Sequence, residues 1–192
     1  DQCDPAFADA EKALSLKRDG FNHGQLGTVQ LDCKNDFDGA IANLSVAIRA
    51  LPKDANYRFS RGRAYASNAD FELALQDYNE AIRLKPREAD YFFRRGHLWS
   101  SQNEPEKAIA DYDRAIALNP KMSAAYSYRG VAYIDKGDRE KALLDHDRAI
   151  QLDPKNADYY DNRASYYRVI GDYERALADN DKAISLDPAS SN

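Results

Sequence analysis

Apolar and polar positions along this chain repeat with one fixed period. The phrase Ala-Ile-x-Leu-x-Pro recurs without change of spacing, and a looser copy precedes the first full one. The copies end at Pro52, Pro86, Pro120, Pro154 and Pro188, which are 34 residues apart. Between these prolines, apolar residues return at the three- and four-residue spacing of one face of an α-helix. The pattern therefore predicts a helical repeat.

Small residues hold fixed places within each period. The first predicted helix carries Gly62, Gly96, Gly130 and Ala164, and the second carries Ala74, Ala108, Ala142 and Ala176. Large rings follow the first set by three residues, at Tyr65, Trp99, Tyr133 and Tyr167. We expect the helix backbones to approach closely at the small residues and these rings to fill the gaps beside them.

A turn separates the two helices of each period. Residues that favour a left-handed backbone stand where the first helix ends, at Asn35, Asn103, Gly137 and Gly171, with Ala69 as the exception. The following residue is Asp36, Asp70, Asp138 or Asp172, which predicts an N-cap for the second helix, and Glu104 is followed by Pro105. Each period therefore reads as a helical hairpin.

This spacing of Gly or Ala, aromatic, Ala, aromatic, Ala and Pro resembles the tetratricopeptide repeat family, in a style common in bacteria. The resemblance implies an all-α, right-handed superhelical solenoid of antiparallel helix pairs. Residues 21–54 match less well, since Thr28 and Leu31 replace the usual glycine and tyrosine and Gly24 and Gly27 weaken the first helix. We expect an N-terminal helical cap at 1–20, a degenerate repeat at 21–54, and repeats at 55–88, 89–122, 123–156 and 157–190.

The resemblance also implies a function, which is non-catalytic binding of a protein or peptide in a concave groove lined by the first helices. On that surface the predicted contacts mix aromatic and basic groups suited to an acidic or aromatic peptide: Phe59, Arg63, Phe93, Arg94, His97 and Tyr128. These residues also fit an ordinary solvated helix face. Two other functions stay open, namely a self-assembling structural protein and an accessory subunit of a larger complex.

Opposite charges recur in phase with the repeat. The arginines are Arg61, Arg95, Arg129 and Arg163, and the aspartates are Asp77, Asp111, Asp145 and Asp179. We predict structural ion pairs between packed helices, either within a hairpin or across to its neighbour. The alternative is a row of arginines that faces a ligand.

Composition narrows the choice of partner. The net charge of −5 and the isoelectric point near 5.3 offer no basic field for a nucleic acid. No apolar run approaches the roughly 18 residues that would predict insertion into a membrane. His23, His97 and His146 lie in different repeats without an acid or nucleophile partner, and no glycine-rich phosphate loop occurs. We therefore expect no catalytic site, no metal site and no cofactor.

Both cysteines, Cys3 and Cys33, lie in the least regular part of the chain. A disulfide between them would tether the N-terminal segment to the first hairpin, whereas the alternative is two reduced thiols. Disulfides persist mainly in oxidising compartments, so the sequence favours an exported or periplasmic protein over a cytoplasmic one. The start at Asp1 fits a removed leader and a trimmed chain equally.

The C-terminal end of the array has an expectation of its own. Residues 189–192, which follow Pro188, supply no capping helix, so we expect Tyr173, Leu177 and Ile184 to be partly exposed. Such a flank predicts a homo-oligomer through the C-terminal repeat as one alternative.

Overall fold

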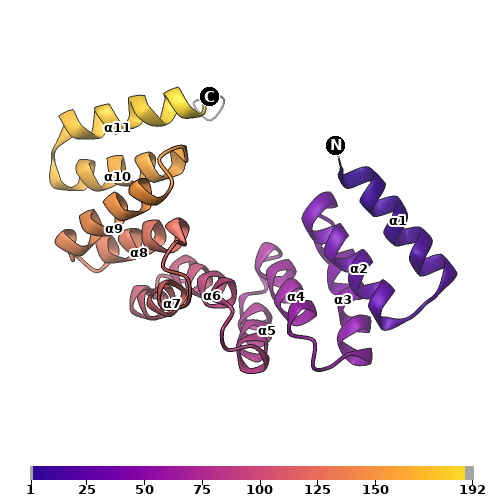
Figure 1. Ribbon diagram of the computed structural model, residues 1–192. Coiled ribbons are helices and arrows are strands. Elements are labelled where there is room, and N and C mark those ends of the chain that lie inside the picture. Colours follow the sequence, from indigo (N-terminus) through magenta and orange to yellow (C-terminus); the bar gives the residue numbers. More distant parts are fainter. Residues whose placement is uncertain (1, 189–192) are drawn as a thin grey trace. The chain divides into compact units, whose positions relative to one another are not determined.

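Helices and turns make up the whole of the computed structural model, which describes residues 2–188 (Figure 1). The residues after Pro188, which bear on the expected lack of a capping helix, lie at 189–192, outside the described residues, as does Asp1. Within residues 2–188 there is no β-strand. The predicted all-α array of antiparallel helix pairs is confirmed.

Eleven α-helices and one π-helical turn, η1, follow one another along residues 2–188. They are α1 (Cys3–Leu16), α2 (Gly20–Val29), η1 (Gln30–Lys34), α3 (Phe37–Ala50), α4 (Ala55–Ser67), α5 (Phe71–Leu84), α6 (Ala89–Ser101), α7 (Pro105–Leu118), α8 (Ser123–Asp135), α9 (Arg139–Leu152), α10 (Ala157–Ile170) and α11 (Tyr173–Leu186). The chain divides into two compact units, Asp1–Arg94 and Arg95–Asn192.

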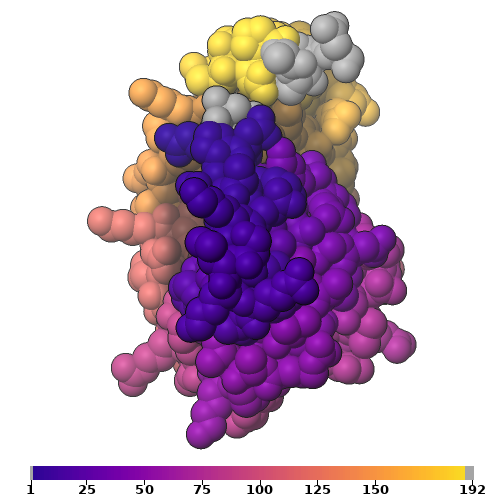
Figure 2. Space-filling model, turned by 90° about the vertical axis from the view of Figure 1, so that its right-hand side faces the viewer, coloured from indigo at the N-terminus to yellow at the C-terminus, as the bar shows by residue number. Residues whose placement is uncertain are grey.

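In the first unit, α2 packs against α3 and α4 against α5, and α1 lies on α2 and η1. Leu31, Leu44, Ile48 and Tyr57 form the core of this unit together with alanines of the same helices. In Figure 2 the surface of α1, in indigo, lies in front of the surface of the helices that follow it. The N-terminal segment is thus a packed helix of the first unit.

A disulfide between Cys3 and Cys33 fastens α1 to η1, with 5.2 Å between the two Cα atoms. An ion pair between Asp4 and Lys34 lies beside it. Of the two states that the sequence left open for these cysteines, the structure contains the bonded one.

The first helix of the least regular hairpin forms in spite of its glycines. A Cβ added at Gly24 would lie 2.3 Å from the ring of Tyr57, and one at Gly27 would lie 2.8 Å from Cγ of Leu44. Larger residues would therefore clash with side chains that pack on α2. The sequence suggested glycines that only weaken a helix, whereas the structure shows that they allow the close approach of α3 and α4.

In the second unit, α8 pairs with α9 and α10 with α11, while α7 lies on α8 and α9 lies on α10. Tyr166 and Tyr167 of α10 form a core with Ala142 of α9 and Ala176 of α11, and Leu143 packs against the same cluster. The small residues let the helices approach, and the rings bury apolar area worth about 25 cal/mol per Å². Each second helix that has a following hairpin in this unit therefore contacts two first helices.

The turns lie where the sequence placed them. Backbone φ is positive at the end of each first helix from η1 to α10, at Asn35, Ala69, Asn103, Gly137 and Gly171. The carboxylates of Asp36, Asp138 and Asp172 accept from backbone amides that open the second helix. Asp70 makes no such bond, so its expected capping role is absent.

The rings that fill the space beside the small first-helix residues come from the second helices. A Cβ added at Gly62 would lie 2.9 Å from Tyr78, and at Gly96 and Gly130 the nearest rings are those of Tyr112 and His146. The sequence assigned this role to Tyr65, Tyr133 and their equivalents. Tyr167 packs with Ala142 and Ala176 of the second helices, and Tyr133 packs against the same cluster. Tyr65 lies near a repeated arginine, at 5.6 Å from Cζ of Arg61.

Candidate functional site

Each of the four arginines that recur with the repeat binds an aspartate of its own hairpin with two hydrogen bonds. Nε and Nη2 of Arg61 donate to the two oxygens of Asp77 at 2.7 and 2.9 Å. The same fork recurs at Arg95 with Asp111, Arg129 with Asp145, and Arg163 with Asp179, at 2.6 to 2.8 Å. Two parallel bonds fix the orientation of both side chains. These pairs hold the two helices of a hairpin together.

The third guanidinium nitrogen, Nη1, reaches the preceding hairpin. Nη1 of Arg61 donates to Oγ of Ser45 at 3.0 Å, and Nη1 of Arg163 donates to Oδ1 of Asp147 at 2.6 Å. Arg129 makes the equivalent bond to Asp113 at 2.5 Å. One side chain thus joins three helices, within its hairpin and across to the neighbour.

Burial and charge agree with this role. The aspartates are at most 7% exposed, whereas the second acceptors Asp113 and Asp147 are exposed. Hydrogen bonds to Asp179 and Asp147 outweigh burial and raise the pKa of Arg163. The repeated arginines are therefore held by the scaffold.

Among the predicted groove residues of the first unit, Phe59 lies in ring contact with Tyr78, and Arg63 and Arg94 act on it electrostatically. The ring of Phe59 lies 4.5 Å from that of Tyr91 and 5.8 Å from that of Tyr78, and Phe59 is half-buried. Burial raises the pKa of Tyr78 to about 12, against the opposing positive charges of Arg94 and Arg63. The positive charges of both guanidinium groups therefore favour the ionised form of the same buried hydroxyl, beside the ring of Phe59.

Exposure differs among these residues. Arg94 is exposed and its guanidinium lies 5.7 Å from the ring centre of Phe93, which is only 9% exposed. Arg63 is half-buried and bonds Asp32 at 2.9 Å. Arg94 is thus the most accessible cation of the group, Arg63 already carries one carboxylate, and the two phenylalanines lie mainly beneath the surface.

In the second unit, His97 and Tyr128 meet edge to face, with 5.0 Å between ring centres. His97 is exposed and Tyr128 is half-buried. Near Tyr128 in the sequence, the fully buried Ser127 accepts a hydrogen bond from Nδ2 of Asn162 at 2.9 Å. The imidazole of His97 is therefore the accessible polar group here, since Ser127 is buried.

Asn56 and Asn162 were expected on the concave face, but the hydrogen bonds that they make between hairpins were not predicted. Oδ1 of Asn56 accepts from the hydroxyl of Tyr91 at 2.8 Å and from Nζ of Lys85 at 3.2 Å. Asn162 holds Ser127 in a similar way, at a separation of 35 residues in both cases. A separation of one repeat plus one residue between polar residues of first helices is the signal that could have pointed to these bonds.

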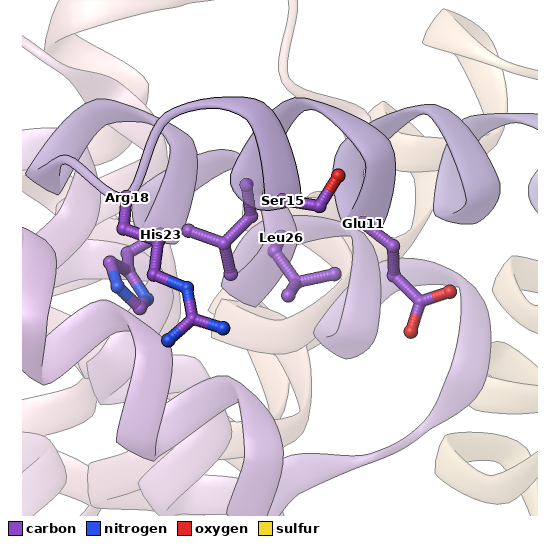
Figure 3. A pocket seen from close by; sticks show the side chains of 6 residues that line it. Glu11, Ser15, Arg18, His23 and Leu26 are labelled. Carbon is purple, nitrogen blue, oxygen red and sulfur yellow. The ribbon is translucent and has the colours of Figure 1, made fainter.

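A depression between α1 and α2 was also outside the prediction (Figure 3). Its volume is about 240 Å³, and Glu11, Leu14, Ser15, Arg18, His23 and Leu26 line it. In Figure 3, Arg18 and His23 lie at one end of this row and Glu11 at the other. His23 is engaged with Oδ1 of Asn43 at 2.8 Å. The volume is below the roughly 300 Å³ at which small-molecule sites begin.

Residues 2–188 contain neither a membrane-spanning helix nor a metal-binding cluster. No helix in this range is long and apolar enough to cross a bilayer. No group of three or more His, Cys, Asp or Glu side chains in the same range is placed to hold a metal ion.

Family models for the tetratricopeptide repeat match this chain at 34–89, 89–122, 123–156 and 147–178. The matches together span residues 34–178, which is most of the chain. The chain therefore belongs to the tetratricopeptide repeat family, whose members act as protein- or peptide-binding scaffolds. A comparison with curated proteins finds no match.

Several solved structures share the fold. A tetratricopeptide repeat protein from Parabacteroides merdae ATCC 43184 has a TM-score of 0.81 at 21% identity, covering 96% of this chain and 73% of its own. MamA from Desulfovibrio magneticus RS-1, from residue 41, has a TM-score of 0.78 at 19% identity, covering 90% and 97%. YrrB, described as a TPR protein with an unusual peptide-binding site, has a TM-score of 0.70 at 23% identity, covering 94% and 93%. At these identities the likeness shows the fold.

The two carboxylates bound by Arg129 provide a matched test of the scaffold. Asp145→Ala is expected to lower the free energy of unfolding by about 3 kcal/mol, because it leaves a largely buried guanidinium without its main partner. Asp113→Ala removes the exposed carboxylate from the same arginine and should cost less than about 1 kcal/mol. Urea denaturation followed by circular dichroism measures both values. Equal losses would show that the bond within the hairpin contributes no more to the free energy of unfolding than the bond between hairpins.

His146 makes stability depend on pH. The side chain is fully buried and neither ring nitrogen has a hydrogen-bond partner, and burial lowers its pKa to about 4. Because the unfolded chain binds the proton more tightly, with a pKa near 6.5, the stability from the neutral ring is complete above that pH. This stability is lost progressively as the pH falls below 6.5, and the loss is complete once the pH has fallen through 4. Between pH 7 and pH 5 the loss is about 2 kcal/mol.

His146→Phe should remove this loss, since Phe has no group to titrate. It keeps an aromatic ring at the position that Tyr112 occupies in the preceding repeat. Urea denaturation of both proteins at pH 7 and pH 5 gives the comparison. The same decline in variant and wild type would contradict a buried neutral His146.

Proposed function

We propose that this chain holds an acidic segment of a partner protein on the surface formed by Phe59, Arg63, Phe93 and Arg94 of the first unit. The observation that carries the proposal is the exposed guanidinium of Arg94, which lies 5.7 Å from the ring centre of Phe93. The positive charges of Arg94 and Arg63 both oppose the rise in the pKa of Tyr78, which agrees with a basic surface at this place. Membership of a family of interaction scaffolds supports it, as does YrrB, a protein of the same fold described as having a peptide-binding site.

The chemistry of this surface favours an anionic ligand. Arg94 is exposed, and Arg63 uses one Nη2 bond to Asp32 and keeps other donors. A carboxylate placed between them would gain two charge-assisted hydrogen bonds beside apolar rings. The half-buried Phe59 offers its ring edge to an aromatic or apolar residue of the ligand.

His97 and Tyr128 extend the proposal to the second unit. Their edge-to-face contact leaves the imidazole of His97 exposed beside the half-buried ring of Tyr128. Such a surface suits hydrogen bonds to a peptide backbone or to polar side chains. The acidic segment itself is assigned to the first unit.

We also propose that the chain is not an enzyme. Each histidine has a local structural setting: His23 contacts Asn43, His97 contacts Tyr128, and His146 is buried. The repeated arginines and aspartates neutralise each other in pairs instead of converging on a reacting atom. These settings support binding without chemistry.

Affinity capture from an extract of the source organism tests the surface. The double variant Arg63→Glu/Arg94→Glu should recover at least tenfold less of the partner than wild type, because it places like charges against an acidic segment. Lys53→Glu/Arg87→Glu changes the net charge equally at exposed turn residues and should recover it fully. Mass spectrometry identifies the captured protein.

The single variant Arg94→Glu controls for a folding defect of the double variant, because Arg63 also binds Asp32 whereas Arg94 is exposed. It should also recover less of the partner than wild type. A partner recovered equally by all variants would exclude this surface.

We further propose that the chain works in an oxidising compartment and is exported. The Cys3–Cys33 disulfide supports this, because it closes a loop of 30 residues and fastens α1 to the first hairpin. Alkylation of intact source cells before lysis, followed by intact-mass measurement, should leave both cysteines unmodified. Two alkylated thiols would place the protein in a reducing compartment.

A further inference from the structure

The last helix of the second unit exposes apolar residues whose counterparts in the preceding repeat are partly buried. On α11, Leu177 is 62% exposed and Ile184 is 47% exposed. Their counterparts 34 residues earlier, Leu143 and Ile150, are half-buried. In the second unit α11 packs against α10, and Figure 1 shows no other helix of that unit on its far side. This exposed side, formed by Leu177, Asn180, Asp181 and Ile184, is called the end face.

The corresponding face of α9 shows what the end face is built to hold. Leu143 packs against the cluster that contains Tyr166 and Tyr167 of α10, and His146 lies 6.3 Å from the ring centre of Tyr166. Oδ1 of Asp147 accepts from Nη1 of Arg163 at 2.6 Å. A helix with an arginine and two tyrosines, one turn apart, thus occupies this face of α9.

The end face repeats that binding surface almost residue for residue. Three of its four residues are identical to their α9 counterparts, and only Asn180 differs, from His146. Asp181 is the counterpart of Asp113 and Asp147, both of which hold an arginine of the next first helix. Asp181 is exposed and has no ion-pair partner within residues 2–188. The end face therefore presents an unpaired carboxylate beside apolar side chains.

Charge decides the occupant. A second copy that used its own end face would bring two Asp181 carboxylates together, and a net charge of −5 on each copy adds to the repulsion. In a second copy, the arginine that is followed by aromatic rings three and four residues later is Arg163, which is already held by Asp179 and Asp147. The carboxylate instead requires an unpaired guanidinium on the incoming helix.

We propose that the end face docks an amphipathic helix of a partner protein, with an arginine that binds Asp181 and with tyrosine or phenylalanine three and four residues later that pack on Leu177 and Asn180. Arg163, Tyr166 and Tyr167 of α10 display this arrangement within the chain itself. The site is separate from the surface proposed for the acidic segment.

A peptide copied from α10 tests the proposal. The probe is residues 156–171 with capped ends, a fluorescent label, and a lactam bridge from Asp161 to a lysine at position 165, since isolated helices of this length are only marginally stable. Fluorescence anisotropy should show saturable binding to the full chain. The Asp181→Arg variant should bind at least tenfold more weakly, because it opposes two guanidinium groups.

Charge reversal provides the decisive control. A peptide with Arg163→Glu should bind wild type at least tenfold more weakly and should recover binding to Asp181→Arg. Ser185→Arg puts the same side chain one turn further along α11, where Arg83 and Gln151 of earlier repeats bond within their own helices, and should bind the original peptide like wild type.

Other results would overturn the proposal. The Arg63→Glu/Arg94→Glu variant should bind the peptide like wild type, and a loss there would locate the peptide at the first-unit surface instead. No binding, or binding that does not respond to Asp181, would leave no role for the end face. Sedimentation that shows self-association of wild type, abolished by Asp181→Arg, would assign the face to a second copy.

Discussion

The structure depends on one side chain that recurs in four hairpins, an arginine whose guanidinium binds in two directions. Nε and Nη2 hold an aspartate of the same hairpin, and Nη1 reaches the hairpin before it, as Arg61 does with Asp77 and Ser45. A lysine could not meet these demands, because it offers no planar fork. The spacing of 16 residues to both acceptors follows from the helix and turn lengths, so the repeat period and the ion pairs require each other.

Most of the fold could be predicted from the sequence because the same pattern of residues recurs in several repeats. The turns were found from single residues, and Ala69 adopts the left-handed backbone of its counterparts although alanine does not favour it. The roles of Gly24 and Gly27 were misjudged, since propensity describes an isolated helix and the side chains of Tyr57 and Leu44 decide at this place. Tertiary packing outweighed local preference there.

The candidate site was less accessible to sequence reasoning. Periodicity identifies the face of a helix, but it does not tell how far a neighbouring helix covers that face. Phe93 was expected as a contact residue and is only 9% exposed, while Arg63 is bound by Asp32 from the irregular η1 turn, which no repeat pattern predicts. The acceptors of Nη1 also escaped notice, because Ser45 and Asp113 differ in residue type at one repeat position.

The division between charges that are paired within the scaffold and charges that are not is the basis of both proposed binding surfaces. A guanidinium with a buried bidentate partner has its position fixed and offers a ligand little, whereas one without such a partner can exchange water for a carboxylate at small cost. By this criterion Arg94 is free to recognise an anion, and Asp181 is the matching case of opposite sign on α11. The repeat sets the positions where charges pair within the scaffold, and it also sets the position on α11 where the pairing stops. The proposed docking of a partner helix on Asp181 therefore follows from the same repeat that builds the fold.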